Sequence, residues 1–125
     1  MNFIDYIIIE DLGSIETNTS FKDLTTIGCG GDIDVVYVPK SIEALQKAFK
    51  YIIGNNINYI VLGNGSNILA RDERFHGVVI LLKKLQYDFK VEGDILECSA
   101  FYPTMKLAYD LKDLEVGDLS FLGGI

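Results

Sequence analysis

The sequence predicts an α+β fold made of two subdomains. Three observations support this: a strand–helix–strand pattern over residues 33–62, a change near Leu85 to strict alternation of apolar and polar residues, and a hairpin signal at Gly93-Asp94. The chain has 125 residues, of which 49% are hydrophobic and 23% charged. It is therefore long enough for one hydrophobic core and too short for two independent ones.

Residues 1–17 show no clear periodicity, and we expect them to form a loosely attached lead-in. Asp5 and Glu10 interrupt the apolar stretch there, and no basic residue precedes it, so we do not expect a signal peptide. The first subdomain is then expected over residues 18–84. Residues 85–125 are expected to form the start of the second subdomain, which we expect to be incomplete.

The first subdomain contains the strand–helix–strand unit. β-branched residues over 33–38 predict a strand that is buried on both faces. Ser41 is a suitable N-cap for the following helix, and Gly54 is expected to end it. The buried face of this helix is expected to carry the apolar residues at helical spacing, which are Ile42, Leu45, Phe49 and Ile52. A second strand over 58–62 should then run parallel to the first, through a right-handed crossover.

A third buried strand is expected over residues 78–82, after which the pattern changes. Apolar and polar residues alternate over 85–92, Gly93-Asp94 can form a two-residue turn, and 95–100 can return as the paired strand. Pro103 suits the first turn of a further helix. One stripe of that helix is expected to hold Met105, Ala108 and Leu111.

Charge and hydropathy narrow the function classes. A formal net charge of −7 argues against a binder of nucleic acid or of anionic membranes, because such proteins neutralise many phosphates with Lys and Arg. A diphosphate ligand is compatible with this charge, since backbone N–H groups can hold phosphate. No apolar run approaches the roughly 20 residues needed to cross a bilayer, so we expect a soluble, cytoplasmic protein.

No metal site is predicted. His76, the only histidine, has no acidic or cysteine partner at metal-ligand spacing and is expected to be a solvated loop residue. Cys29 and Cys98 are expected to be buried as small apolar residues. A group of acidic residues near the end of the last helix is expected to form a solvated face, and its members are Asp110, Asp113, Glu115 and Asp118.

The most informative segment directly follows the strand predicted over 58–62. Gly63 and Gly65 permit positive φ angles and let backbone N–H groups converge, while Ser66 and Asn67 add short hydrogen-bonding side chains. This chemistry suits a diphosphate. It is neither the three-glycine dinucleotide fingerprint nor a P-loop, because no Lys follows the glycines. The same residues are typical of a tight turn, and the loop alone does not decide between the two.

The loop belongs to a longer pattern of three ordered motifs. It continues as Leu62-Gly63-x-Gly65-Ser66-Asn67-x-Leu69-x-x-Asp72 and then Phe75-x-Gly77-Val78-Val79-Ile80. Upstream, Thr25-Thr26-Ile27 leads to Gly30-Gly31 and Asp34, and downstream the chain closes with Leu119-Ser120-Phe121-Leu122-Gly123-Gly124-Ile125. Over about residues 18–125, this order and spacing resemble the N-terminal, FAD-binding portion of the UDP-N-acetylenolpyruvoylglucosamine reductases.

The resemblance implies a FAD domain of the two-subdomain, PCMH-type flavoprotein fold, with the cofactor between the subdomains and a separate C-terminal domain for the UDP-sugar substrate. In that family NADPH reduces the flavin, and the flavin delivers hydride to the enolpyruvyl double bond, giving UDP-N-acetylmuramate for peptidoglycan. Two alternatives stay open: a non-catalytic FAD-binding or partner-binding module on the same scaffold, and a related flavin oxidase.

The resemblance also assigns residues. The FAD diphosphate would be contacted by Gly63, Asn64, Gly65, Ser66 and Asn67. A second flavin-contacting turn would begin at Gly124 and Ile125. No catalytic residue is expected within the 125 residues, because the family's proton-donating Ser and its catalytic Arg and Glu correspond to positions beyond Ile125. Two departures stand out: Gly28 replaces a usual Arg or Lys, and Phe101 replaces a small residue where bulk would crowd the flavin.

Overall fold

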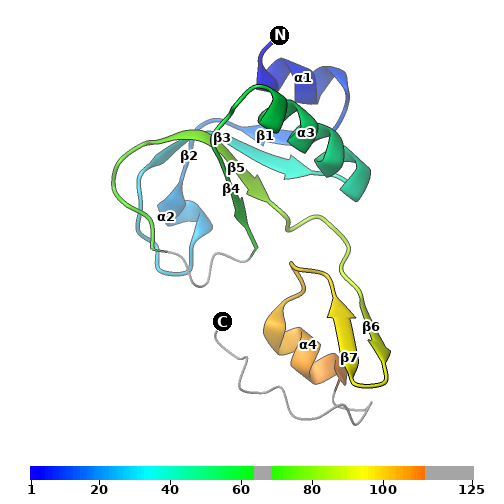
Figure 1. The fold of residues 1–125 in the computed structure, drawn as a ribbon. Coiled ribbons are helices and arrows are strands. Elements are labelled where there is room, and N and C mark those ends of the chain that lie inside the picture. Colours follow the sequence, from blue (N-terminus) through cyan, green and yellow to red (C-terminus); the bar gives the residue numbers. More distant parts are fainter. Residues whose placement is uncertain (64–68, 112–125) are drawn as a thin grey trace. The chain divides into compact units, whose positions relative to one another are not determined.

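The computed structural model describes residues 1–63 and 69–111 (Figure 1). The chain forms two compact units, Met1–Leu85 and Gln86–Ile125, which are described separately below. Both combine helices with strands, in agreement with the predicted α+β class.

A five-stranded mixed sheet forms the larger unit. Its elements in chain order are α1 (Phe3–Ile9), β1 (Gly13–Glu16), β2 (Thr19–Ser20), α2 (Phe21–Leu24), β3 (Asp32–Pro39), α3 (Ile42–Gly54), β4 (Tyr59–Leu62) and β5 (Phe75–Leu81). The strand order is β1-β3-β5-β4, and β2 pairs with the first residues of β3. β3, β5 and β4 are parallel, whereas β1 and β2 run antiparallel to β3. The two strands that flank α3 are thus parallel but not adjacent, because β5 lies between them.

Alternation along the central strands divides the core between the two faces of the sheet. Val36 and Val79 point to the face that Phe21 of α2 covers. Tyr37, one position along β3, points to the other face, where its ring meets Phe3 of α1 edge-on at 5.7 Å. α3 covers that second face, and Figure 1 shows the sheet between α3 and α2. Strands buried on both faces explain the long apolar runs in the sequence.

Small residues bring α3 close to the sheet. Ser41 caps the helix as predicted, because its side chain accepts a hydrogen bond from the Ala44 N–H at 3.1 Å. The buried stripe consists of Ala44, Ala48 and Ile52, with Leu45 and Phe49 partly buried beside it. The prediction was wrong for Ile42, whose residue surface is 45% exposed. Periodicity of large apolar residues misplaced the stripe, since two of its three buried positions are alanines.

The residue with the left-handed backbone conformation after α3 is Asn56, where a glycine is the usual residue. The last residue of α3 is Gly54, Asn55 is the C-cap, and the positive φ of 52° belongs to Asn56. Asn tolerates this conformation better than other residues with a Cβ, because its short polar side chain bonds locally. The helix therefore ends at Gly54 as predicted, but the left-handed residue that follows it is Asn56 and not the glycine.

The first 17 residues are not a loosely attached lead-in. α1 places Phe3 and Ile7 in the core, and β1 pairs with the second half of β3. The buried Tyr37 hydroxyl donates a hydrogen bond to the Leu12 carbonyl at 2.9 Å, and burial is the main reason why the pKa of Tyr37 is raised to about 12. A seven-residue helix is too short to show a clear period, which is why the sequence did not predict it.

The smaller unit is a hairpin packed on a helix, formed by β6 (Phe89–Glu92), β7 (Ile95–Cys98) and α4 (Thr104–Leu111). Gly93 has a φ of 59°, as the predicted turn requires. Its core holds Tyr102, Leu107 and Leu111, with Phe89, Val91 and Leu96 against them. Ala108, predicted for the buried stripe, is only partly buried, and the Met105 side chain lies outside what the structure describes.

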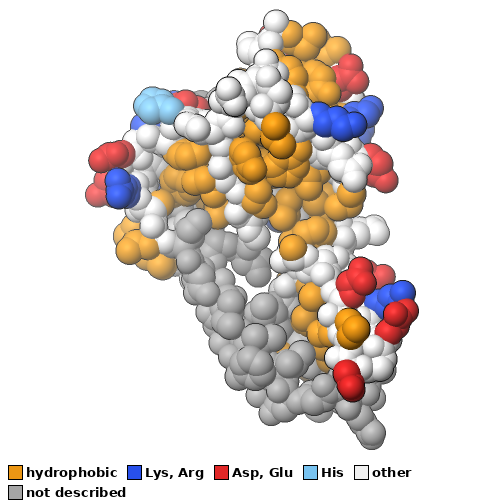
Figure 2. Space-filling model, in the orientation of Figure 1, with side chains coloured by type: hydrophobic (Ala, Val, Ile, Leu, Met, Phe, Trp, Pro, Cys, Tyr) orange, Lys and Arg blue, Asp and Glu red, His pale blue; other side chains and the backbone are white. Residues whose placement is uncertain are grey.

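The outer strand β4 carries exposed apolar side chains. Tyr59 and Val61 are 44% and 42% exposed, and the Tyr59 ring meets Phe49 of α3 edge-on at 5.3 Å. Figure 2 shows hydrophobic side chains gathered over α3 and the strands beside it. Within the described ranges, no helix is long and apolar enough to cross a membrane.

We predict that Ile7→Ala destabilises the protein by about 2–5 kcal/mol, because the fully buried Ile7 side chain would leave a cavity between α1 and the sheet. The free energy of unfolding in urea, followed by circular dichroism, measures this loss. Ile8→Ala is the matched control, since Ile8 is 64% exposed and should change stability by no more than about 0.5 kcal/mol. Equal, small effects of both variants would show that α1 is not packed in solution.

Candidate functional site

The candidate site lies where the chain leaves the outer parallel strand. Leu62, the last residue of β4, is buried and pairs with Leu81 of β5. The chain then leaves the sheet at Gly63 and returns through residues 69–74 to β5. Ligands of sheets with parallel strands usually bind beyond the carboxyl ends of the strands, which is where Gly63 lies.

Gly63 is the only proposed cofactor-binding residue that the structure describes. Asn64, Gly65, Ser66 and Asn67 lie outside the described residues, as do Gly124 and Ile125. Gly63 is exposed, and a Cβ built on it would meet no described atom within 4 Å. Its φ also lies outside the left-handed region, contrary to the expectation of a positive angle. Neither its backbone conformation nor its packing against the described residues therefore requires a glycine.

The return arm, which we define as Ala70–Glu73, lies against the upstream glycine pair Gly30-Gly31. The Gly31 N–H donates a hydrogen bond to the Arg71 carbonyl at 2.8 Å. On its other side, the Gly31 carbonyl accepts a hydrogen bond from the Phe21 N–H at 2.9 Å. The structure thus brings the segment after the glycine loop against the upstream Gly30-Gly31 motif, a proximity for which the sequence offered no physical reason.

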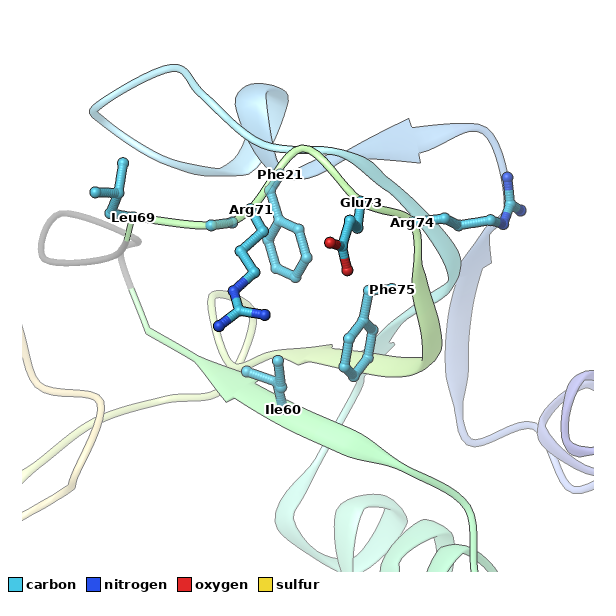
Figure 3. Close-up of a pocket in the computed structure, with 8 residues that line it drawn as sticks. Phe21, Ile60, Leu69, Arg71, Glu73, Arg74 and Phe75 are labelled. Carbon is cyan, nitrogen blue, oxygen red and sulfur yellow. The ribbon is translucent and has the colours of Figure 1, made fainter.

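An apolar pocket of about 330 Å³ opens beside the return arm (Figure 3). It is lined by Phe21, Ile60, Leu69, Ala70, Arg71, Glu73, Arg74 and Phe75. Phe21 and Phe75 meet edge-on across its floor, with ring centroids 6.0 Å apart. In Figure 3 the side chains of Arg71 and Glu73 point into the pocket, whereas Arg74 points away. An apolar floor between one cation and one anion can hold a flat organic group.

Sequence reasoning missed this pocket. Its apolar floor combines α2, β4 and β5, and the order of these elements in the sheet is not readable from periodicity. A signal was present, because Arg71 and Glu73 belong to a run of four charged residues, Arg71-Asp72-Glu73-Arg74, that directly follows the apolar Ile68-Leu69-Ala70. We interpreted only the acidic residue between them, Asp72, as part of the motif.

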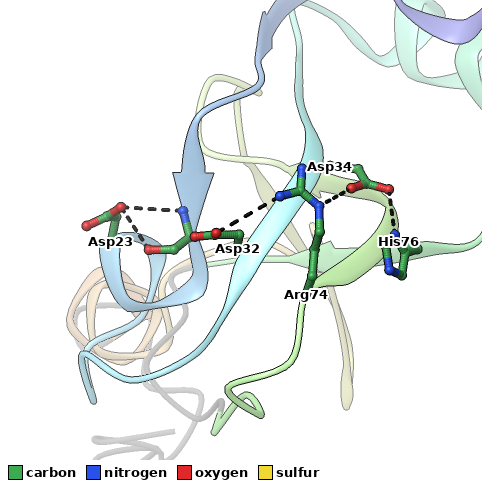
Figure 4. A network of polar contacts seen from close by, with 6 residues as sticks. Asp23, Asp32, Asp34, Arg74 and His76 are labelled. Carbon is green, nitrogen blue, oxygen red and sulfur yellow. Dashed lines mark hydrogen bonds and ion pairs between the residues drawn. The ribbon is translucent and has the colours of Figure 1, made fainter.

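A polar network anchors the far end of the return arm (Figure 4). Arg74 Nε donates a hydrogen bond to Asp34 Oδ1 at 2.6 Å, and Arg74 Nη1 lies 4.0 Å from Asp32 Oδ2. His76 Nδ1 lies 3.3 Å from the other oxygen of Asp34. The hydrogen bond from Arg74, and secondarily that with His76, lowers the pKa of Asp34. The network therefore links residues at the start of β5 to the first residues of β3.

His76 is solvated as predicted, with 77% of its side chain exposed, but it lies on β5 rather than in a loop. The strand begins three residues earlier than expected because Phe75 pairs with Ile33. Position 76 also has an acidic neighbour in space, Asp34, which is 42 residues away in the sequence. Sequence spacing could not reveal that partner.

The prediction of buried cysteines was wrong. Cys29 lies in the segment between α2 and β3, Cys98 is the last residue of β7, and both are exposed. Among the described residues, no group of His, Cys, Asp and Glu side chains is arranged to hold a metal ion. Of the predicted acidic face, Asp110 accepts hydrogen bonds from Tyr102 and Lys106. Asp113, Glu115 and Asp118 lie outside the described residues.

The departure at Gly28 has a local explanation. Gly28 has a φ of 75°, and its N–H donates to the Thr25 carbonyl at 3.2 Å and to Thr25 Oγ1 at 3.3 Å. An Arg or Lys in that left-handed turn would be strained, so the turn accounts for the glycine. Phe101, the other departure, is partly buried in the smaller unit.

Comparisons with known proteins identify relatives. The reductase "UDP-N-acetylenolpyruvoylglucosamine reductase" of Clostridium tetani is 36% identical over 120 residues, which are 94% of this chain and 39% of the relative. The proteins of the same name from Halalkalibacterium halodurans and Bacillus subtilis are 34% and 30% identical, over 91% and 92% of this chain. The chain thus spans less than two fifths of the length of these relatives.

A family model described as "FAD binding domain" matches residues 33–115. The match begins in β3 and includes the glycine loop, the return arm and the whole of the described hairpin and α4. Together with the mixed α+β architecture, it confirms the predicted fold class. Because the match covers more than half of the sequence, the chain belongs to the FAD-binding-domain family.

Proposed function

We propose that this chain is the FAD-binding part of an NADPH-dependent reductase that converts UDP-N-acetylenolpyruvoylglucosamine to UDP-N-acetylmuramate in peptidoglycan synthesis. The observation that carries the proposal is Gly63, at the carboxyl end of a parallel strand, a glycine that neither backbone conformation nor packing against the described residues requires. A ligand that must approach the backbone explains a glycine at such a position. The names of the relatives supply the substrate and the type of reaction.

In this proposal the loop 63–67 holds the FAD diphosphate. The residues fit the group because they offer backbone N–H donors and short polar side chains, and no described atom lies within 4 Å of a Cβ built on Gly63. A backbone cradle also suits the formal net charge of −7, which would oppose binding through general positive charge. Bound FAD would supply the hydride-transfer chemistry, while the residues of this chain bind and orient it.

The remaining parts of the proposal concern the rest of the enzyme. The UDP-sugar would be bound mainly by residues of a further domain, since the chain aligns with only 39% of its Clostridium tetani relative. We assign no catalytic residue to this chain. We infer a cytoplasmic location, where NADPH is available, and neither nucleic acid nor a membrane as a partner.

We predict that the full gene product containing this chain purifies with bound FAD, and that Gly63→Ala raises the Kd for FAD about 10- to 100-fold. The methyl group would occupy the space through which the diphosphate approaches, at the cost of about one charge-assisted hydrogen bond, ~1.5–3 kcal/mol. Flavin fluorescence quenching measures the Kd.

Gly54→Ala is the matched control for this test. It makes the same chemical change at another exposed glycine whose added Cβ meets no described atom within 4 Å, at the end of α3 and outside the loop. Both variants should unfold within about 0.5 kcal/mol of the wild type. A colourless wild-type protein that takes up no FAD would refute the proposed function, and unchanged FAD affinity of Gly63→Ala would refute the proposed site.

We further predict that the full gene product oxidises NADPH when the UDP-enolpyruvyl sugar is added, and that the 125-residue chain alone does not. The chain should also bind FAD weakly, because a site made from part of a domain must order itself with fewer contacts. Absorbance at 340 nm follows NADPH, with a flavin-only blank as reference. Turnover by the 125-residue chain above that blank, or submicromolar FAD affinity, would contradict this prediction.

A further inference from the structure

We propose that Gly30 and Gly31 are positioning residues for the glycine loop. Neither is among the residues assigned to FAD, and both act on the loop through the return arm Ala70–Glu73. The inference rests on the proposed function of the loop, and it adds a second, remote requirement for that function. The glycine pair and the return arm lie too close together for a side chain to fit between them.

Gly31 faces three consecutive carbonyl groups of the return arm. Its N–H binds the Arg71 carbonyl at 2.8 Å, and a Cβ at Gly31 would lie 2.3 Å from the Glu73 oxygen and 2.5 Å from the Asp72 oxygen. Backbone atoms cannot turn aside as the end of a flexible side chain can. The arm would have to move by ~1 Å to restore ordinary contact distances, so only glycine allows this arrangement.

Gly30 fixes the same arm from the side. A Cβ there would lie 2.5 Å from the Phe21 Cβ and 2.9 Å from the Ala70 Cβ, and the φ of Gly30 is 130°, which residues with a Cβ rarely adopt. Phe21 in turn packs edge-on against Phe75, at the start of β5. The glycine pair therefore lies between α2 and the arm, with no room for a side chain on either side.

The described residues on both sides of the loop are fixed by the fold. At one end, Leu62 is fixed in the sheet by pairing with Leu81. At the other, the return arm is fixed by Gly31, and the ion pair of Arg74 with Asp34 holds the residue that follows it. Only residues 64–69 join Gly63 to the arm. A displacement of the arm by ~1 Å would therefore act across only six residues from Gly63, and a misplacement of that size can reduce the efficiency of a site about 100-fold.

The test compares Gly31→Ala with Gly54→Ala in the full gene product, using FAD and riboflavin as two ligands. Riboflavin lacks the diphosphate, so it reports on the rest of the flavin site. We expect Gly31→Ala to raise the Kd for FAD at least 10-fold while the Kd for riboflavin changes less than about 2-fold. Gly54→Ala should change neither. A purely structural role of Gly31 would weaken both ligands together.

A second measurement avoids the risk that Gly31→Ala fails to fold. In the wild-type protein, the hydrogen exchange of the Gly31 amide should slow on FAD binding more than that of the Leu45 amide, which donates a hydrogen bond to the carbonyl of the N-cap Ser41. This follows because coupling between the loop and the arm is reciprocal. Equal slowing of both amides would overturn the inference, as would normal FAD affinity in a folded Gly31→Ala protein.

The failures of the two proposals are distinguishable. If the wild-type protein takes up no FAD, the proposed function fails. If the wild type binds FAD and Gly63→Ala weakens it, but Gly31→Ala behaves as Gly54→Ala, the proposed function stands and the positioning role of the glycine pair is refuted.

Discussion

The larger unit is organised around β3, whose two edges and two faces are all occupied. β1 and β2 pair along one edge and β5 along the other, while Val36 and Tyr37 point into different layers of the core. Because β5 occupies the second edge, β4 can only join the sheet outside it. That placement brings the carboxyl end of β4, and with it the glycine loop, to the margin of the sheet, where a ligand can reach it.

The glycines of this chain serve three different physical needs. Gly28 has a left-handed turn conformation, Gly31 allows two backbone segments to approach, and Gly63 meets neither of these needs. The first two are explained by the protein alone. Gly54 shares this freedom among the described residues, so what distinguishes Gly63 is its place at the carboxyl end of a parallel strand, where ligands usually bind. A motif rich in glycine is thus informative once each glycine has been tested against its surroundings.

Strong local signals predicted the parts of the fold that depend on neighbours in sequence. Ser41 and the turn at Gly93 have specific backbone requirements, and both occur as predicted. The packing of α1 was missed, because one short helix carries too few periodic positions. The position of β5 between β3 and β4 was also missed, because the order of parallel strands depends on long-range packing that a single periodic segment does not encode.

In the candidate site too, the features that depend on neighbours in sequence could be predicted, and those that depend on long-range contacts could not. The glycine loop could be found from the sequence because its residue types lie next to one another, and its chemistry follows from them. The pocket and the contact between Gly31 and Arg71 could not, because they join segments about 40 residues apart. Asp34 illustrates the point, since its Arg74 and His76 neighbours become visible only when β3 and β5 pair.

These contacts also explain how an acidic protein can present a site for a diphosphate. Arg74 forms ion pairs with Asp34 and Asp32, so its charge holds the start of β5 in place. Arg71, whose side chain points into the pocket, has no ion-pair partner among the described residues. Because so little positive charge lies beside the loop, long-range electrostatic attraction cannot dominate the binding of a diphosphate. The position of the backbone N–H donors must therefore dominate it. Backbone donors bind well only when their segment is held in place. The contact of Gly30 and Gly31 with the return arm, which fixes the position of the arm, therefore meets a requirement of such a site.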